Sequence, residues 1–350
     1  MVGHDPLIEI IIPNWNGKRM LEHCLASLWQ QTYSNFRVIV VDNGSSDGST
    51  QMLEASFPEV RLIKLHQNTG FSIAVNEGIA ASAAPWLLLL NNDMEVACDC
   101  LEKLVQAIDQ YPQYHVFALK MLNYQSRDLI DGAGDAVMRG GVGYRIGTLE
   151  RDSKGYQKDR ETFGACAGAA LYKKSLFKKI GLFDADFFAY LEDVDLNMRA
   201  RRYGFRCMFV AAAIVYHIGS ASSGSKINSL TIRLSTRNNI CVLAKNYPLR
   251  LVFLFFPAIV IYQLAWMCFC VKKGMALPYL TGLYQGIWTL PYFYRKGRTL
   301  RESGQLIDLG VFAKMISSAE REAVRSIMTR RIAAGKNNFL LSCYCKFFFL

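Results

Sequence analysis

The sequence predicts an α/β fold with a mostly parallel central sheet and flanking helices. Short apolar runs that suit strands alternate with helix-like segments along the first 120 residues, which is typical of βαβ units. The run Leu87–Leu90 is four leucines long, as expected of a strand buried on both faces inside a parallel sheet. Open sheets of this kind bind ligands outside the carboxyl ends of their strands, so the polar residues after each run are the first candidates for a site.

Each element follows from its apolar pattern. Strands are expected over residues 7–12, 36–41, 60–65, 86–90 and 114–119, because these runs are apolar and are bounded by turn residues. Helices are expected around residues 20–28, in a short segment reaching 57, from 68 to about 83, and over 98–110. Residues 122–162 are rich in Gly and charge and are expected to form a loop or hairpin excursion near the site. The small residues of 164–171 indicate close packing or close approach of a ligand.

The charge of the chain is unevenly distributed. Residues 1–225 have a net charge of −3 and residues 226–350 a net charge of +14, which together give the total of +11. The basic part is also apolar and aromatic, which favours anionic lipid over nucleic acid as its partner. We therefore expect an α/β domain (1–225), a membrane-associated helical region (226–300) and a basic C-terminal tail (301–350).

Two apolar stretches follow the predicted α/β domain. Leu251–Val271 has 21 residues without a charge, and as a helix it would span about 30 Å, one hydrocarbon core. Met275–Tyr294 contains Gly and Pro and is the weaker spanning candidate. We interpret them as a membrane hairpin or as two interfacial helices, with a pair of core helices as the alternative. Ala319–Arg331 suits a basic amphipathic helix, and the apolar tail 339–350 has no assigned role.

The cysteines and the start of the chain indicate the compartment. None of the ten cysteines forms a C-x-x-C pair, so we expect reduced structural thiols in a cytosolic setting. Residues 1–6 are polar and lead into a strand without a signal peptide, which predicts that the front domain stays in the cytoplasm.

Polar residues follow three of the predicted strands. They are the segments Pro13–Gly17, Asp42–Ser49 and Asn91–Asp93, which are expected to meet at one sheet edge. An aromatic ring, amides and carboxylates beside Gly-rich turns suit the base and ribose of a nucleotide. The sequence has no P-loop and no G-x-G-x-x-G after a strand, so a bound phosphate would need a metal or a basic side chain. Asp93 fits the metal hypothesis, and a helix N-cap is its alternative.

A second group of candidates lies at residues 183–195, where five carboxylates occur among aromatic residues. Apolar surroundings raise carboxylate pKa values, so one of these acids is a candidate general base. The alternative is a solvated, acid-rich helix start whose acids pair with Arg199, Arg201 and Arg202. His217 follows another strand run and is either a metal ligand or a structural histidine.

Taken together, these motifs resemble the family 2 glycosyltransferases of the GT-A fold, and within them the rhamnosyltransferase-like branch. The resemblance covers about residues 7–250 and rests on motifs in the family's order. They are Ile11–Gly17, Val41–Ser49, Asn68–Phe71 with Asn76 and Gly78, Leu89–Asp93, Phe187–Leu196, Val215–His217 and Arg237–Asn239. Two positions depart from the family pattern: Asn91 stands where the first acid of D-x-D is usual, and Val75 where many relatives have Asn.

The resemblance implies roles for individual residues. Asp193 would be the catalytic base, and Asp93 with His217 would bind Mg²⁺ or Mn²⁺. Gly168, Tyr190 and Glu192 would lie on the acceptor side. The implied donor-binding residues are Pro13, Asn14, Asn16, Asp42, Asn43, Ser45, Asp47, Asn68, Gly70, Asn76, Asn91 and Asn92.

The resemblance also implies an activity. We expect an inverting, metal-dependent transfer of a sugar, rhamnose being one candidate, from a UDP- or dTDP-linked donor to a lipid-linked or cell-surface glycan acceptor. The expected location is the cytoplasmic face of the inner membrane, in polysaccharide or cell wall biogenesis, without nucleic acid as a partner. The alternatives are a polyprenyl-phosphate glycosyltransferase and a non-catalytic, membrane-bound subunit that binds nucleotide sugars.

Two other enzyme classes fit the sequence less well. A nucleotidyltransferase would start with a Gly-rich, Arg-containing loop after its first strand, where this chain has Pro13–Asn16. A processive polysaccharide synthase would have a Q-x-x-R-W segment, which the sequence lacks, and more membrane helices.

Overall fold

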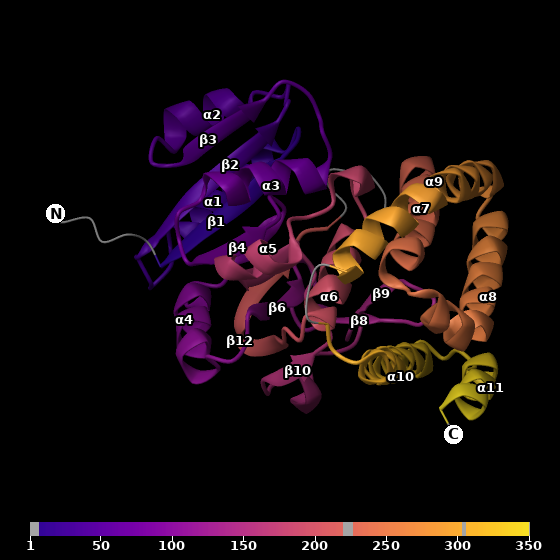
Figure 1. Cartoon of the computed structure of the whole chain (residues 1–350). Coiled ribbons are helices and arrows are strands. Elements are labelled where there is room, and N and C mark those ends of the chain that lie inside the picture. Colours follow the sequence, from indigo (N-terminus) through magenta and orange to yellow (C-terminus); the bar gives the residue numbers. More distant parts are fainter. Residues whose placement is uncertain (1–6, 220–226, 303–305, 350) are drawn as a thin grey trace.

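A computed structural model describes residues 7–219, 227–302 and 306–349 of the chain. The polar start at residues 1–6 and the predicted domain boundary at residue 225 lie outside these ranges. Figure 1 shows an α/β unit built on a twisted sheet and, on the side away from the N-terminus, a group of helices from the last third of the chain. This arrangement agrees with the α/β fold that the sequence predicts.

Ten strands of the described residues form one mixed sheet, in the order β10-β12-β6-β11-β4-β1-β2-β3, with β5 paired to β12 and β7 to β6. β8 and β9 form a separate hairpin. The strands are β1 (Ile8–Asn14), β2 (Phe36–Asn43), β3 (Arg61–Leu65), β4 (Trp86–Leu90), β5 (Met94–Val96), β6 (Val116–Asn123), β7 (Ile130–Ala133), β8 (Asp135–Val137), β9 (Gly143–Arg145), β10 (Arg160–Thr162), β11 (Ala169–Lys173) and β12 (Cys207–His217).

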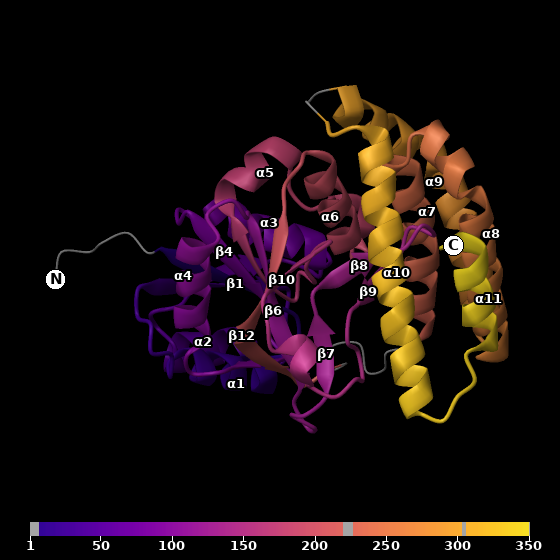
Figure 2. The same cartoon turned by 90° about the horizontal axis from the view of Figure 1, so that it is seen from below.

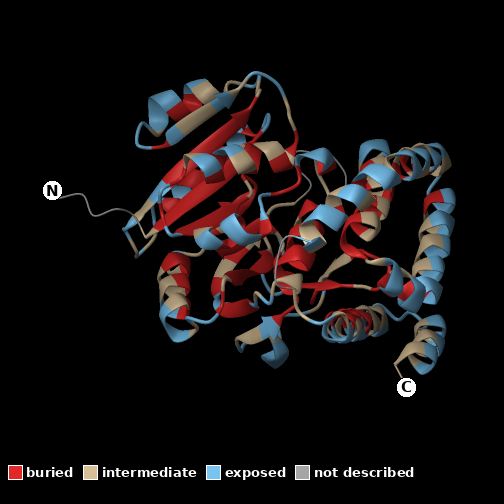
Figure 3. Cartoon of the chain, viewed as in Figure 1, coloured by how far each residue is buried: buried red, intermediate tan, exposed pale blue. Residues whose placement is uncertain are grey.

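Helices cover both faces of the sheet. One face packs against α1 (Lys18–Leu28), α2 (Ser49–Ser56) and α4 (Cys100–Gln110). The other face packs against α3 (Phe71–Ala81), α5 (Lys174–Ile180) and α6 (Glu192–Arg202). Two short 3₁₀ segments, η1 (Lys154–Tyr156) and η2 (Ala185–Phe187), complete the α/β unit. The central strands are therefore buried on both sides, and Figure 3 shows them as the buried interior of the molecule.

The structure refines two expectations about the sheet. Leu87–Leu90 is buried on both faces as predicted, but β4 is parallel only to β1 and runs antiparallel to β11 on its other side. The segment 122–162 is not mainly loop, since it contains β7, the β8–β9 hairpin and β10. Its strands have only three or four residues each, too few for a clear alternating pattern in the sequence.

The helical part consists of α7 (Ser229–Asn246), α8 (Leu249–Lys272), α9 (Ala276–Glu302), α10 (Leu309–Ala333) and α11 (Phe339–Phe348). Figures 1 and 2 show α7 on the inner side of this group, next to the α/β unit, and α8 on its outer side. α9 approaches α7 closely through small residues: a Cβ added at Gly282 would lie 2.3 Å from the carbonyl oxygen of Arg233. Gly282 and Gly286 thus let the two helices pack backbone to backbone.

α8 is apolar but mostly unburied. Its inner face packs against α7, where Gln263 Nε2 donates to Asn239 Oδ1 (2.5 Å) and Trp266 Nε1 donates to Thr236 Oγ1 (2.9 Å). Among the helices that the structure describes, α8 alone is long and apolar enough to cross a membrane, with a mean hydropathy of 2.1 and 17% of its most apolar window buried. A core helix would be mostly buried, so this alternative does not describe α8. Its exposed large apolar residues are Leu249, Phe253, Leu254, Phe256, Val260, Ile261, Leu264, Met267 and Val271.

Candidate active site

The polar segments after β1, β2 and β4 meet at one edge of the sheet, as predicted, because β1 lies between the other two strands. The side chains join in a hydrogen-bonded row across the strand ends. Asn92 Nδ2 donates to Asn14 Oδ1 (2.7 Å), and Asn14 Nδ2 donates to Asp42 Oδ1 (3.2 Å). All three residues are buried, so the row is held in place before any ligand binds.

The turn after β2 is tied to the turn after β1. The backbone N–H of Asn16 donates to Ser45 Oγ (2.9 Å), and that of Lys18 donates to Asp47 Oδ2 (2.8 Å). Asp42 in turn accepts from the backbone N–H of Ser45 (3.0 Å). Asn16 and Asp47 line a smaller cavity of about 540 Å³ at the start of α1, and they do not line the main cleft.

Asn43, at the end of β2, holds the loop that precedes α3. Its Nδ2 donates to Asn68 Oδ1 (3.2 Å) and to the carbonyl oxygen of Gly70 (3.1 Å). Gly70 has φ +87°, and a Cβ there would lie 2.5 Å from the carbonyl oxygen of Phe188, so only glycine fits. The structure does not bring Asn76 into the cleft, because its amide is bonded to the backbone of Phe183 (2.8 and 3.1 Å) and thus holds the acid-rich segment.

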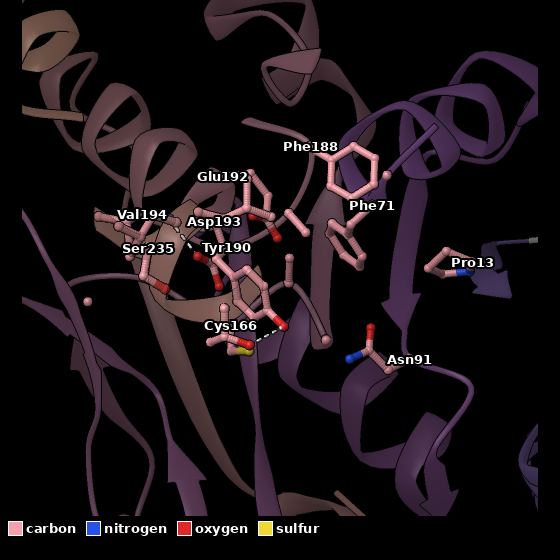
Figure 4. Close-up of a pocket in the computed structure, with 18 of the residues that line it drawn as sticks. Pro13, Phe71, Asn91, Cys166, Phe188, Tyr190, Glu192, Asp193, Val194 and Ser235 are labelled. Atoms are coloured by element: carbon pink, nitrogen blue, oxygen red, sulfur yellow. Dashed lines mark hydrogen bonds between the residues drawn. The ribbon is translucent and has the colours of Figure 1, made fainter. Parts of the chain in front are cut away.

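A cleft of about 1250 Å³ opens between this sheet edge and α7. Figure 4 shows Pro13 and Asn91 on one side of it and Tyr190, Asp193 and Ser235 on the other. The predicted site residues that line it are Pro13, Asn14, Asn43, Asn68, Gly70, Asn91, Asn92, Asp93, Gly168, Tyr190, Glu192, Asp193 and His217.

Asp93 and His217 lie side by side in the cleft, since β5 follows Asp93 directly and pairs with the end of β12. His217 Nε2 is 3.3 Å from Asp93 Oδ2, and His217 Nδ1 is 2.7 Å from Asp131 Oδ2. Burial lowers the pKa of His217, but the hydrogen bonds to Asp131 and Asp93 outweigh it and raise the pKa to about 9. Asp93 Oδ1 is buried and has no hydrogen-bond partner among the described residues.

This donor set suits a divalent cation. A carboxylate oxygen without a partner and an imidazole nitrogen beside it are ligands that Mg²⁺ or Mn²⁺ accepts. Asp131 would orient the imidazole from behind, the usual outer partner of a metal-bound histidine. The fit supports the predicted metal role of Asp93 and His217, while Asp131, within the Gly-rich segment, was not predicted.

Asn91 and Gly168 are neighbours across the β4–β11 junction. The backbone N–H of Asn91 donates to the carbonyl oxygen of Gly168 (2.9 Å). A Cβ at Gly168 would lie 2.8 Å from Asn91 Nδ2, so a larger residue there would push the Asn91 side chain out of place. Gly168 thus leaves room for the side chain of Asn91, the residue that stands in place of the first acid of the D-x-D motif.

The five carboxylates of residues 184–195 fall into two groups. Three have cationic partners: Asp184 contacts Lys245 (2.7 Å) and Lys296 (2.6 Å), Asp186 contacts Lys296 (2.7 Å), and Asp195 contacts Lys245 (2.7 Å) and Arg199 (2.9 Å). Of the three arginines expected to pair with this segment, only Arg199 does so.

The other two arginines bond elsewhere. Arg201 pairs with Glu161 (2.9 Å), and Arg202 donates to the carbonyl oxygen of Ile307 (2.6 Å). They therefore fix α6 to its surroundings and do not neutralise the acid-rich segment.

Glu192 and Asp193 form the second group, without an ion pair to any Lys or Arg that the structure describes. Burial raises the pKa of both carboxyls. Asp193 Oδ1 accepts from the backbone N–H of Val194 (2.8 Å), and the side chain faces the cleft (Figure 4). Glu192 Oε2 is buried with no hydrogen-bond partner among the described residues. A cleft carboxylate that holds its proton more readily than usual suits proton abstraction from a hydroxyl.

Asp135, at the start of β8, lies behind Asp193. Ligand atoms of Asp135, Cys166 and Asp193 are within 4.8 Å of one another. Burial and the nearby charge of Asp193 raise the pKa of Asp135 to about 8, and burial raises that of the Cys166 thiol. Because Asp193 is the candidate base, we interpret this cluster as a carboxyl pair beside the Cys166 thiol. Neither Asp135 nor Cys166 was predicted.

The segment that carries Asp193 has an unusual backbone. Phe188, Tyr190 and Leu191 have φ values of 63°, 70° and 66°, which non-glycine residues rarely adopt. Asn238 of α7 supports this segment, since its Nδ2 lies 2.8 to 3.0 Å from the carbonyl oxygens of Phe187, Ala189 and Tyr190. Asn238 was noted only as part of the Arg237–Asn239 motif, and its supporting role is visible only in three dimensions.

Comparisons with known proteins identify the family of the chain. Residues 9–181 match the sequence family described as Glycosyl transferase family 2. The N-acetylglucosaminyl-diphospho-decaprenol L-rhamnosyltransferase of Mycobacterium tuberculosis H37Rv is 27% identical over 240 residues, 62% of this chain and 78% of that protein. A PGL/p-HBAD biosynthesis glycosyltransferase of Mycobacterium bovis BCG is 29% identical over 201 residues, 55% of this chain and 69% of that protein.

The fold also has a solved counterpart. The crystal structure of GalNAc-T7 with UDP, GalNAc and Mn²⁺ superposes with a TM-score of 0.55 at 16% identity. The match covers 69% of this chain and 48% of GalNAc-T7, so this chain spans about half of that protein. At this identity the likeness concerns the fold alone, and it agrees with the predicted GT-A fold. The chain belongs to glycosyl transferase family 2, has sequence similarity to its rhamnosyltransferases, and is a glycosyltransferase.

Proposed function

We propose that this glycosyltransferase moves a sugar, with inversion, from a UDP- or dTDP-linked donor to a hydroxyl of a lipid-linked or cell-surface glycan acceptor. The observation that carries the proposal is Asp193, a cleft carboxylate with a raised pKa and no direct ion pair among the described residues. The named activity of the Mycobacterium tuberculosis relative supports rhamnose as the first sugar to test.

The proposed step is a single displacement. The acceptor hydroxyl gives its proton to the Asp193 carboxylate, and its oxygen forms a bond to the anomeric carbon of the donor sugar. The bond between that carbon and the phosphate oxygen breaks, and the nucleoside diphosphate leaves with the electron pair. Attack opposite the leaving group inverts the anomeric configuration. Asp193 faces the strand-end residues across the cleft, as this geometry requires (Figure 4).

Asp93 and His217 would hold the divalent cation in this proposal. A bound Mg²⁺ or Mn²⁺ would neutralise charge on the diphosphate. The unpartnered Asp93 Oδ1 and the adjacent imidazole support this assignment. Asn14 and Asn43 line the cleft and would meet the base and ribose, whereas Asp42 does not line it and instead holds the Asn14 amide in place.

The test is sugar transfer from labelled UDP-, dTDP- and GDP-sugars into a bacterial membrane lipid fraction, with Mn²⁺ or Mg²⁺ and with EDTA. We expect label in lipid that EDTA abolishes and that Asp93→Ala strongly reduces. Asp128→Asn, an exposed carboxylate paired with Arg151 outside the cleft, is the matched control and should transfer like the wild type. Nucleotide binding without transfer from any donor would instead favour a non-catalytic binding subunit.

We also propose that the enzyme works at the cytoplasmic face of the inner membrane. The exposed apolar face of α8 supports this, because Phe253 and Phe256 are 76% and 58% exposed. Lys272 and Lys273 end this helix and could meet anionic headgroups. Moving the exposed apolar surface of α8 from water into a lipid phase would lower the free energy by about 25 cal/mol per Å².

Vesicle flotation tests the membrane proposal. The full chain should float with phosphatidylglycerol-containing vesicles, and the double variant Phe253→Asp/Phe256→Asp should bind them less tightly. Arg151→Asp, an exposed change on the α/β unit, is the control for altered charge. Equal flotation of the two-site variant and the wild type would remove α8 as the membrane-binding element.

A further inference from the structure

Arg233 is a cleft residue whose guanidinium makes no ion pair with the residues that the structure describes. It lies on α7 and lines the cleft beside Thr231 and Leu234. Its Nε is buried and makes no hydrogen bond to any described residue. A buried donor left unpaired is unfavourable, so such a group at a site is expected to meet a ligand.

The other arginines near Arg233 are already occupied. Arg237, one turn later on α7, donates to the carbonyl oxygen of Asp186 (2.8 Å) and to Asn238 Oδ1 (2.9 Å). Arg145, on the β8–β9 hairpin, pairs with Asp131 (2.5 Å). Within the described part of the chain, Arg233 is therefore the cleft-lining arginine that remains available to an anion.

The surroundings of Arg233 in the sequence are free of acids. No Asp or Glu occurs between Asp195 and Glu302, which includes α7, α8 and most of α9. The acids that line the cleft come instead from the α/β unit, Asp193 and Glu192 among them. The α7 side of the cleft thus carries positive charge with no acid of its own, which favours an anionic ligand there.

Apolar side chains are present near Arg233 on α7 and on the neighbouring helix α9. Leu230 and Leu234 line the cleft on the same helix, and Leu230 is 44% exposed. α9 lies against the backbone of Arg233 at Gly282, and the residues around Gly282 expose Leu280 and Tyr284. Figures 1 and 2 both show α7 and α9 side by side at the edge of the helical group. A ligand with an anionic group at Arg233 could therefore extend an apolar chain over α7 and α9.

We infer that Arg233 binds the phosphate or diphosphate that joins the acceptor sugar to an apolar chain. This inference rests on the proposed function, because the sugar hydroxyl has to lie at Asp193. The planar guanidinium can donate two parallel hydrogen bonds to one phosphate, which fixes the distance from the anion to the reacting hydroxyl. The acceptor class is then a sugar on a prenyl phosphate or prenyl diphosphate.

The donor also carries a diphosphate, so the test has to separate the two sources. Isothermal titration calorimetry on the full chain in detergent would compare farnesyl diphosphate with farnesol, and UDP with dTDP, in EDTA so that no metal bridges the phosphates. The variants are Arg233→Gln, which removes the charge, and Arg233→Lys, which keeps it. Arg295→Gln is the matched control, an exposed arginine of α9 outside the cleft.

For Arg233→Gln we expect about a tenfold to hundredfold loss of affinity for farnesyl diphosphate, the usual size of a charge-assisted phosphate contact. Farnesol and nucleotide affinities should stay within about twofold, Arg233→Lys should be intermediate, and Arg295→Gln should bind like the wild type. Unchanged binding of farnesyl diphosphate to Arg233→Gln would overturn the inference. A loss of UDP affinity instead would overturn it too, by assigning Arg233 to the donor.

These outcomes are independent of sugar transfer. A wild type that transfers sugar but binds farnesyl diphosphate no better than farnesol overturns the inference and leaves the proposed function intact. A wild type that binds farnesyl diphosphate through Arg233 but transfers no sugar supports the anion subsite and overturns the proposed function.

Discussion

Asp195 and Asp193 are two residues apart on the same helix, yet their carboxyls behave in opposite ways. Asp195 is fully buried, and its pKa lies well below the ordinary range because Arg199 and Lys245 outweigh the effect of burial. Asp193 faces the cleft, and burial raises its pKa because the charge of Arg145 and the backbone hydrogen bonds offset burial only in part. The pKa values of these two acids therefore differ because Asp195 makes direct ion pairs and Asp193 does not.

The same contrast holds for the rest of the segment. Lys245 of α7 pairs with both Asp184 and Asp195. These two buried carboxylates therefore attach α7 to the acid-rich segment and to α6. Glu192 joins Asp193 in lacking a cation among the described residues. Residues 184–195 thus contain both the carboxylates that attach the helical group to the α/β unit and the carboxyls that face the cleft. The predictions below test whether this division is real.

The largest effect is expected for Asp193→Asn. Loss of the carboxylate removes the proton acceptor, and we expect transfer to fall by about 10²- to 10⁴-fold, the usual contribution of a positioned base. The measurement is kcat for sugar transfer, with nucleotide affinity determined in parallel.

Asp186→Asn is the control for this change, since Asp186 belongs to the same segment but is paired with Lys296 outside the cleft. It should retain transfer within about threefold. Transfer by Asp193→Asn at the rate of Asp186→Asn would exclude Asp193 as the base.

Asp195→Asn should reduce stability and not proton transfer. Breaking a buried ion pair leaves Lys245 and Arg199 partly uncompensated, a loss of roughly 3–5 kcal/mol in the free energy of unfolding. Because folding lowers the pKa of Asp195, its contribution is present above the unfolded pKa of about 3.9 and is lost as the pH falls through the folded value.

Urea unfolding of both proteins from pH 7 to pH 3 measures this difference. The gap between wild type and Asp195→Asn should be largest at neutral pH and should narrow as the pH falls below about 4. An Asp195→Asn variant with unchanged unfolding but no transfer would show that Asp195 takes part in the chemistry and does not act through stability.

The sequence was sufficient to predict features that depend on the local order of apolar and turn residues. Strands β1 to β4 and β6, and the meeting of three strand ends, follow from apolar runs, turn residues and the rule for parallel sheets. The family resemblance predicted that Asp93 and His217 share one site, and in the structure His217 Nε2 lies 3.3 Å from Asp93 Oδ2.

Sequence reasoning failed where the partner is far away in the chain. Lys245, which neutralises Asp184 and Asp195, lies 50 or more residues beyond them, and no local pattern links these positions. Asp131 and Asp135 lie in short strands without a visible period. Asn76 was predicted to bind the donor because its motif is close to donor-binding residues, but its side chain turns to Phe183.

Asn238 tests whether α7 positions the reactive segment. Asn238→Ala removes the bonds to the carbonyl oxygens of Phe187, Ala189 and Tyr190, which hold a backbone with three positive φ values. We expect kcat to fall about tenfold while the KM for the donor stays within about twofold, because the donor side of the cleft does not depend on this amide.

Asn239→Ala is the matched comparison, since the adjacent amide donates to the carbonyl oxygen of Gly140 (2.8 Å) and does not touch the reactive segment. Each variant should lose about 1–2 kcal/mol of unfolding free energy, but only Asn238→Ala should lose most of its kcat. Equal losses of kcat in both variants would mean that α7 acts only through stability.

The smallest effect is expected for Asp135→Asn, and it concerns the shape of a pH profile. With a pKa of about 8, Asp135 is neutral at pH 7 and adds no second negative charge beside Asp193. Above pH 8 it ionises, and the extra charge should repel the anionic donor. The wild type should therefore show a donor KM that rises above pH 8, whereas Asp135→Asn should keep a flat KM up to pH 9 and transfer within about threefold at pH 7. Parallel KM profiles for the two proteins would show that Asp135 does not ionise in this range. Glu192 and Asp193 would then be the acids without an ion pair that determine the charge of this side of the cleft.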